Sequence, residues 1–408
     1  MKNVAVIGAG AAGLVAAYFA ALNANRVTVF EKNEKCGKKI YITGKGRCNV
    51  THICTPQEFL ENVVSNPKFL TGAVYSFSPE DTFKFFEEGG LPLKVERGAR
   101  VFPVSDKASD VTRCLENYCK SAGVTFKFNE KVLGLDILNS TMRGIITDKG
   151  AYSFDCVIVC TGGISYPSTG STGDGYKFAQ AAGHGIIEPK QGLCGLNLKG
   201  DFYKNLQGLS LKNINLSLFS NGKHLKSFFG EMLFTHYGIS GPTVLSASSL
   251  INRLDLGGVK IVLDLKPALS DEQLDKRILR DFEAYKNKSI ANCLKELLPQ
   301  ALIPEILFRS GVGEDRKVNS ITKPERAALL TNIKNFDMLV ASLRDFTEAI
   351  ITCGGVDVKQ INPKTMESKL VKGLYFCGEV LDLDAFTGGY NLQIAFSTGH
   401  AAGTSIKE

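Results

Sequence analysis

Short apolar runs, separated by helical patterns, mark both ends of the chain. Asn3–Ile7 (NVAVI) and Cys156–Cys160 (CVIVC) are apolar at almost every position, which is typical of parallel strands buried on both faces. Arg26–Phe30 (RVTVF) and Leu374–Cys377 (LYFC) are runs of the same kind. An alanine-rich helix is predicted over Leu14–Leu22. This alternation of strand and helix predicts an α/β fold with a doubly wound sheet.

The segment between these runs combines helices with short strands. Helical patterns fill residues 56–90, and Thr55-Pro56 and Ser78-Pro79 have the composition of capped helix starts. Residues 95–104 are typical of a strand pair, and a helix is predicted over Lys107–Ser121. The strands that follow are expected to form one β-meander, and they are Val124–Phe128, Lys131–Leu138, Arg143–Asp148 and Tyr152–Phe154.

The pattern changes at about Gly192. Strand-like segments such as INLSLFS and VKIVLDL suit a small barrel or sandwich, and residues 270–332 are helical and charged. We therefore predict an inserted domain over residues 192–349, in which a β part encloses the helical part at about 270–332. The first domain then consists of two segments, residues 1–191 and 350–408.

The composition favours a globular protein with an anionic small ligand. The chain has 408 residues, of which 44% are hydrophobic, enough for more than one structural unit and a large binding site. The formal net charge is +7, a mild excess spread along the whole sequence. No basic run is interleaved with aromatic residues, so we do not expect a nucleic acid as partner.

The cysteine pattern and the N-terminus bear on the compartment. The eleven cysteines form no CxxC pair and no cluster with histidine, so we expect neither a dithiol redox centre nor a metal site. The first apolar run is short and leads into a glycine turn, unlike a signal peptide or a membrane span. We expect a cytoplasmic protein with reduced thiols and no membrane partner, and the sequence leaves the oligomeric state open.

The first strand leads into a dinucleotide-binding motif. Gly8, Gly10 and Gly13 in GAGAAG have GxGxxG spacing between a strand and a helix, where a pyrophosphate can approach the backbone and the helix N-terminus. Glu31 ends the second strand about twenty residues later, where its carboxylate can accept the hydroxyls of an adenosine ribose. A carboxylate at this position would repel a 2′-phosphate, so the bound nucleotide is expected to be FAD or NAD rather than NADP.

Three further segments distinguish FAD from NAD, because FAD is longer and needs more of the chain to hold it. The first is GKGRCN, in which Gly46 can approach a ligand and Arg47 and Asn49 can donate to it. The second is Thr161-Gly162-Gly163, after the strand that ends at Cys160. The third joins Gly378-Glu379 to a helix from about Asn391 to Thr404, whose N-terminus would face the flavin pyrimidine. No second GxGxxG follows a strand, so a dedicated NAD(P) domain is not expected.

These motifs resemble one family. GAGAAG, GKGRCNVTH, TGGISYPSTGSTGDGYKFAQAAGH, MLFTHYGISGP and GEVLDLDAFTGGYNLQIAFSTG are similar to the BaiN/YhiN-like family of NAD(P)/FAD-dependent oxidoreductases, which includes aminoacetone-oxidase-like flavoproteins. The resemblance spans nearly the whole chain. It implies a Rossmann-like FAD-binding domain in two sequence segments, noncovalent FAD, and an inserted β-barrel-like plus helical domain. Members of that family carry Asn where this chain has His52, a departure at the edge of a loop.

The motifs and the resemblance together define a set of predicted cofactor-binding residues. Val132 enters the set because strands of its kind commonly pass the adenine in this fold class. The set is Gly8, Gly10, Ala12, Gly13, Glu31, Lys32, Lys39, Gly46, Arg47, Cys48, Asn49, Val132, Thr161, Gly162, Gly163, Gly378, Glu379, Gly389, Asn391 and Leu392.

Few side chains are candidates for catalysis, since a flavin itself carries the hydride. His236, in FTHYGISGP, lies in a glycine-bounded loop and could exchange a proton with a substrate, although most single histidines are structural. Tyr166, in SYPSTG, could donate to a substrate carbonyl or could be a packed turn residue. Cys48 follows Arg47, which could acidify its thiol, but no resolving cysteine is visible and packing is the simpler role.

The sequence therefore predicts an FAD-dependent oxidoreductase that transfers a hydride between flavin N5 and a small organic substrate. The leading hypothesis is reduction of an activated C=C bond with NAD(P)H as a transient electron donor. Two alternatives stay open: an aminoketone or amine oxidase that uses oxygen, and a flavin-binding protein that modifies RNA or has no catalytic role.

Overall fold

The structure, a computed structural model, describes residues 1–407. The chain divides into two compact units. Unit 1 is made of Met1–Gly192 and the chain from Asp345 onward, and unit 2 is Leu193–Arg344. Within residues 1–407, no helix combines the length and the apolar character needed to cross a membrane.

The core of unit 1 is a five-stranded parallel sheet in the order β19-β10-β1-β2-β6. The central strands are buried on both faces because nearly all their side chains are apolar. In chain order the strands are β1 (Asn3–Ile7), β2 (Arg26–Glu31), β6 (Thr125–Phe128), β10 (Cys156–Val159) and β19 (Leu374–Phe376).

The assignment of the strand near Thr125 to a β-meander was wrong. β6 pairs in parallel with β2 and extends the main sheet. The reason lies in the connection, because α6 (Ala108–Ser121) runs back along the sheet and delivers the chain in parallel orientation. Only the next three strands form the meander.

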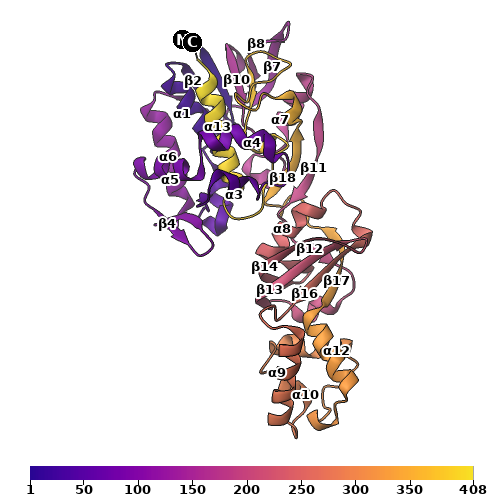
Figure 1. Cartoon of the computed structure of the whole chain (residues 1–408). Coiled ribbons are helices and arrows are strands. Elements are labelled where there is room, and N and C mark those ends of the chain that lie inside the picture. Colours follow the sequence, from indigo (N-terminus) through magenta and orange to yellow (C-terminus); the bar gives the residue numbers. More distant parts are fainter. Residues whose placement is uncertain (408) are drawn as a thin grey trace. The chain divides into compact units, whose positions relative to one another are not determined.

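The first and last long helices of unit 1, α1 (Ala11–Leu22) and α13 (Tyr390–Ser405), lie side by side (Figure 1). Glycine permits this approach: a Cβ on Gly399 would lie 2.5 Å from the Ala12 carbonyl oxygen. The two ends of the chain also meet. The Asn25 side chain accepts from Lys2 N at 3.1 Å and donates to Ile406 O at 2.8 Å.

Smaller elements complete unit 1. Its other helices are α2 (Lys38–Ile42), α3 (Pro56–Leu60), α4 (Pro67–Ser76), α5 (Pro79–Glu88) and α7 (Asp174–Ala181). The predicted capped starts at Thr55 and Ser78 are confirmed, since each side chain closes a capping box. Its small sheets are β3 (Thr51–His52), β5 (Arg100–Pro103) and β4 (Leu93–Glu96); β7 (Val132–Leu138), β8 (Thr141–Thr147) and β9 (Gly150–Ser153); and β11 (Ile186–Gly192) with β18 (Ile351–Val356).

Unit 2 consists of a closed barrel and a helical part (Figure 1). Around the barrel the strands are β12 (Leu196–Leu198), β15 (Gly238–Ser240), β14 (Lys223–Thr235), β13 (Ser210–Ser220), β16 (Val259–Asp264) and β17 (Phe336–Leu343). The helices are α8 (Pro242–Ile251), α9 (Asp271–Ala284), α10 (Ile290–Leu294), α11 (Ile303–Arg309) and α12 (Lys323–Lys334). The predicted fold class, a Rossmann-like domain in two segments with an inserted barrel and helices, is confirmed.

Candidate functional site

Three neighbouring strands of unit 1 end at the same edge of the sheet. Ile7 of β1 is in register with Val159 of β10, and Val159 with Phe376 of β19. Three glycine-containing segments follow these strand ends directly: Gly8–Gly13, Thr161–Gly163 and Gly378-Glu379. The carboxyl edge of a parallel sheet is where nucleotides bind in this architecture. The topology thus brings together three segments that are far apart in the sequence.

The glycines of the GxGxxG turn differ in their surroundings. A Cβ on Gly13 would lie 1.9 Å from Gly8 O, and one on Gly8 would lie 2.6 Å from Cys160 O, so both positions are closed to side chains by backbone packing. Within the described chain, a Cβ on Gly10 would have no heavy atom within 4 Å. Gly10 also begins α1 without a side-chain cap, so the backbone there is open to an anionic ligand.

Glu31 lies at the end of β2 and is buried beside this turn. Its Oε2 accepts from Ala9 N at 2.9 Å, and its Oε1 accepts from Asn33 N at 2.8 Å and Asn33 Nδ2 at 2.7 Å. The carboxylate therefore holds the turn in place, and Oε2, which accepts one hydrogen bond, keeps acceptor capacity for a ribose hydroxyl. Whether it also binds a nucleotide stays a prediction.

Lys39 and Glu379 join the first and third segments. Lys39 Nζ donates to Glu379 Oε2 at 2.7 Å and to Ser165 Oγ at 2.6 Å. Glu379 Oε1 also accepts from Ser165 Oγ at 3.0 Å and from Thr352 N at 2.8 Å. Both charged side chains are about a quarter exposed or less. This network fixes the carboxylate at the strand-end edge.

The GKGRCN loop has a backbone that few sequences tolerate. Gly44, Lys45, Gly46 and Cys48 all have positive φ, and the two glycines relieve part of the cost. Asn49 Oδ1 is buried and has no hydrogen-bond partner anywhere in residues 1–407. A buried acceptor without a donor is rare in native proteins, and a bound ligand is one way to satisfy it.

The structure gives Arg47 and Cys48 local partners. Arg47 pairs with Glu96 and with Asp106, the latter at 2.6 Å, and lies over the Phe102 ring. Cys48 is fully buried, and burial raises the pKa of its thiol to about 12. The hypothesis that Arg47 acidifies this thiol is therefore wrong, because burial raises the pKa of the thiol more than any nearby positive charge lowers it.

At the start of α13, Gly389 packs against the chain that follows the GKGRCN loop. A Cβ on Gly389 would lie 2.5 Å from the Thr51 carbonyl, so glycine is required at this helix start. The Asn391 side chain accepts from Ala385 N at 3.0 Å and donates to Ala385 O at 2.8 Å, which leaves its backbone rather than its amide for a ligand. Leu392 is half-buried against the core.

Other predicted residues support the site from further along the chain. Lys32 pairs with Asp174 at 2.8 Å and donates to Thr172 at 2.7 Å. Ala12 lies beneath Gly378, where a Cβ would approach its methyl group to 2.8 Å. Val132 is buried at the start of β7.

The two catalytic candidates belong to different units. Tyr166 lies in unit 1 at φ 50°, with its backbone N donating to Phe346 O at 3.0 Å. Burial raises the pKa of its phenol, so the group stays protonated at neutral pH. His236 is exposed in unit 2, between β14 and β15, and its ring meets Tyr237 edge to face. Neither role is tested by these contacts.

Sequence reasoning missed several residues of this edge. Thr352 Oγ1 accepts from Ile164 N at 2.9 Å and Ser165 N at 3.0 Å, and so shapes the segment after β10. The Tyr176 hydroxyl is buried without a hydrogen-bond partner in the described residues. Ser165 lies within the TGGISYPSTG motif and could have been predicted from it, whereas no sequence motif surrounds Thr352.

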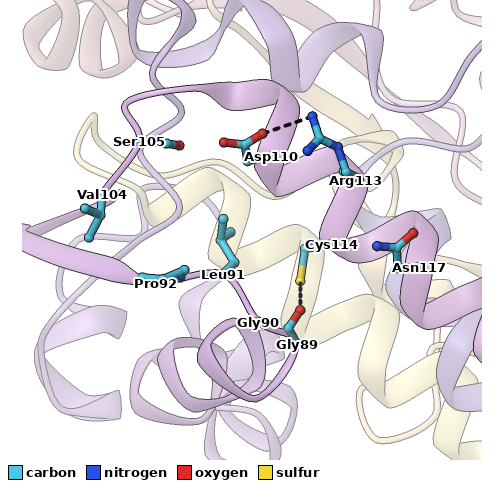
Figure 2. A pocket seen from close by; sticks show the side chains of 10 residues that line it. All are labelled: Gly89, Gly90, Leu91, Pro92, Val104, Ser105, Asp110, Arg113, Cys114 and Asn117. Atoms are coloured by element: carbon cyan, nitrogen blue, oxygen red, sulfur yellow. Dashed lines mark hydrogen bonds and ion pairs between the residues drawn. The ribbon is translucent and has the colours of Figure 1, made fainter.

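A surface pocket of about 420 Å³ lies elsewhere on unit 1, and Figure 2 shows its lining. Asp110 and Arg113 form an ion pair at 3.2 Å there, and Cys114 donates to Gly89 O at 3.5 Å. Burial raises the pKa of the Cys114 thiol to about 11, so it is a poor nucleophile. No predicted cofactor residue lines this pocket, and we place the site at the strand ends instead.

The residues at the strand ends fit an FAD. Gly10 and the bare N-termini of α1 and α13 offer backbone donors to phosphates and to the flavin, and Asn49 offers an unsatisfied acceptor. The Oε2 atoms of Glu31 and Glu379 each accept one hydrogen bond within residues 1–407 and would each have room for a hydroxyl group. Across residues 1–407 no cluster of side chains could hold a metal ion.

Known proteins resemble the chain over its whole length. The family described as "HI0933-like protein Rossmann domain" matches residues 2–405. The "Ribosomal RNA dihydrouridine synthase" of Haemophilus influenzae is 31% identical over 407 residues, which are 98% of this chain and 97% of that protein. The "3-dehydro-bile acid delta(4,6)-reductase" of Clostridium scindens is 30% identical over 414 residues, covering 100% of both. A 3-ketosteroid-delta4-(5alpha)-dehydrogenase of Rhodococcus jostii has a TM-score of 0.52 at 14% identity, over 99% of this chain and 96% of that one, and shares the fold.

Proposed function

The chain belongs to the HI0933-like Rossmann family of FAD-dependent oxidoreductases, and we propose that it reduces a carbon–carbon double bond conjugated with a carbonyl group, with NAD(P)H as electron donor. Bound FAD supplies the hydride carrier for this reaction. The overall balance is addition of one hydride and one proton across the double bond, with oxidation of NAD(P)H. The proposal rests on the strand-end edge, where the backbone at Gly10 is open and Lys39 pairs with Glu379, and on the buried Asn49 oxygen of the GKGRCN loop, which has no hydrogen-bond partner in residues 1–407.

The names of two relatives support this reaction class. A dihydrouridine synthase saturates the double bond of a uracil ring, and a delta(4,6)-reductase saturates double bonds conjugated with a 3-oxo group. Both substrates have an alkene polarised by a carbonyl. A small enone is therefore the first candidate substrate for this chain.

Residues of the chain have separate tasks in this proposal. Gly10 and the start of α1 would hold the pyrophosphate, and Glu31 and Glu379 would orient the sugar and ribityl hydroxyls. Tyr166, protonated because burial raises its phenol pKa, would donate to the substrate carbonyl. His236 is the second candidate for the proton exchange, and His236→Ala tests it by turnover with FAD still bound.

A uracil base in RNA is the second candidate substrate, and the charge distribution favours it. Leu193–Arg344 holds 21 of the 48 Lys and Arg residues but only 15 of the 41 Asp and Glu residues. Six of the seven net positive charges therefore lie in unit 2. The expectation of no nucleic-acid partner rested on an even spread of charge and on the lack of a basic run interleaved with aromatic residues. The division of charge between the units removes the first of these two reasons.

Anaerobic flavin reduction tests the proposal. FAD-loaded protein is mixed with NADH, with NADPH and with aminoacetone, and the reduced enzyme is then given a 4-en-3-one steroid or a uridine-containing RNA. We expect a nicotinamide to bleach the flavin and one alkene to return the colour, with a product that has gained two hydrogens. Bleaching by the amine alone, with peroxide formed in air, would instead support an aminoketone oxidase. Tyr166→Phe should retain FAD and lose turnover.

The cysteines agree with a cytoplasmic location, which belongs with this proposal. No disulfide joins them within residues 1–407, and ten of the eleven are buried while Cys54 is half-buried. Reduced thiols in this number are typical of a reducing compartment.

A further inference from the structure

An exposed phenylalanine lies on the outer face of the barrel. Along β14 the side chains alternate, so that Met232 and Phe234 enter the core while Phe229 points outward and is 66% exposed. β14 pairs with β15 only over Leu233–Thr235, so residues 223–232 have β13 as their single strand neighbour in the described chain. Phe229 therefore lies on the β13–β14 hairpin with its side chain exposed to solvent, while α8 contacts the same strand at Glu231.

Polar side chains surround this ring. Asn215 of β13 is directly opposite Phe229, and the hydroxyls of Ser217 and Ser227 lie 2.9 Å apart on the next pair. His224 Nε2 lies 2.8 Å from Ser227 Oγ. The second aromatic ring of this face, Phe219, meets His224 edge to face near the tip of the hairpin. Solvent-accessible aromatic rings among amides and hydroxyls resemble the base-stacking surface of a nucleic-acid-binding sheet.

The charges around this face are positive. Lys212 lies in the bulge of β13 beside the hairpin, Lys223 at its tip, and Lys260 on β16 opposite Phe219. None of these three lysines has an ion-pair partner within residues 1–407. The acidic Asp264 on the same face is neutralised by Lys334 at 2.6 Å, which leaves Glu231 as the acid on β14.

We infer that the β13–β14 face around Phe229 binds single-stranded RNA, by stacking a base on the ring and contacting phosphates with Lys212, Lys223 and Lys260. This inference rests on the second candidate substrate of the proposed function. The face would anchor the RNA molecule that carries the target base. The complementary charge of unit 2 selects RNA over a second copy of the chain, which has the same sign of charge.

Fluorescence anisotropy of the full-length, FAD-loaded protein with a labelled oligouridylate tests this inference. Phe229→Ala should raise the Kd by about 5- to 50-fold, because one stacked base is lost, and Phe229→Tyr should restore binding to within about twofold. Replacing Lys212, Lys223 and Lys260 by Gln should reduce the slope of log K against log salt by about 2.

Matched controls lie in the helical part of the same unit. Phe308 on α11 is 81% exposed, and Phe308→Ala should leave the Kd unchanged. As a second control, the exposed residues Lys276, Lys286 and Lys295 are replaced together by Gln. This variant should change the salt slope by less than the variant with Gln at positions 212, 223 and 260 does. Equal loss of binding in test and control variants would overturn the inference, since it would show diffuse attraction only.

Two further outcomes would also overturn it: no binding by the wild type, or a change from dimer to monomer in Phe229→Ala by light scattering with RNA binding unchanged. Flavin reduction by NAD(P)H and turnover of the enone are measured on every variant. RNA binding through Phe229 without flavin reduction would overturn the proposed function alone. If the protein turns over the enone but Phe229→Ala binds RNA with the same Kd as the wild type, this inference alone is overturned.

Discussion

Gly10 and Gly13 belong to one motif, but the structure predicts opposite effects when each is replaced by alanine. A Cβ on Gly13 would lie 1.9 Å from Gly8 O, so the turn and the helix must separate by more than about 1 Å. A Cβ on Gly10 meets no heavy atom of the described chain within 4 Å, and its φ of −83° suits alanine. Gly13→Ala should therefore damage the fold, and Gly10→Ala should damage only the ligand site.

The magnitudes follow from packing. Forcing a methyl group into the Gly13 position should cost about 2–3 kcal/mol, which lowers Tm by about 4–12 °C for a unit of this size. Gly10→Ala should change the Tm of the FAD-free protein by no more than about 2 °C. FAD at about 100 times its Kd should add about 2.7 kcal/mol to the wild type, or about 5–10 °C, and little to Gly10→Ala.

Thermal unfolding with and without FAD separates these effects. The apoprotein of each variant is melted alone and with a titration of FAD. Gly72 of α4 is the control, because a Cβ there would meet only Pro363 O, at an ordinary contact distance of 3.8 Å, at negative φ and outside the predicted cofactor set. The reasoning is refuted if Gly10→Ala keeps the FAD-dependent rise in Tm, or if it destabilises the apoprotein as much as Gly13→Ala does.

Other predictions concern single side chains. Lys39→Met leaves the Glu379 carboxylate without its cation and should lower the free energy of unfolding by about 1–2 kcal/mol in urea titrations. Lys84→Met, which removes an exposed pair with Glu80, should leave the midpoint unchanged. His400 lies against Phe77 and Phe19, and burial lowers its pKa to about 4, so the unfolded chain binds more protons than the folded chain between about pH 6.5 and 4. As the pH falls across that window, protonation of this group should lower the free energy of unfolding of the wild type by about 2–3 kcal/mol. If the free energies of unfolding of wild type and His400→Leu differ by the same amount at pH 7.5 and at pH 5, this prediction is contradicted. Cys48→Ala should keep its FAD affinity and its turnover within about threefold of the wild type, because a thiol with a pKa of about 12 forms no thiolate at neutral pH. A complete loss of turnover in a folded, yellow variant would instead show that the thiol has a chemical role.

The sequence by itself determined the features that depend on short stretches of chain. Strand, glycine turn and helix follow one another within Asn3–Leu22, so the GxGxxG site could be recognised without any distant contact. The capped starts at Thr55 and Ser78 are local for the same reason, since cap and partner are three residues apart. The family and the fold class followed from such motifs and from the order of the strands.

Only the tertiary structure decided how distant groups pair. Arg47 contacts Glu96 and Asp106, β6 joins the main sheet, and Thr352 supports a loop almost two hundred residues earlier in the chain. The same holds for the open space at Gly10 and for the exposure of Phe229, because a sequence pattern does not show what surrounds a position. Local patterns select the elements, whereas partners and surroundings arise only when the packed sheet and barrel bring remote segments within a few ångströms of one another.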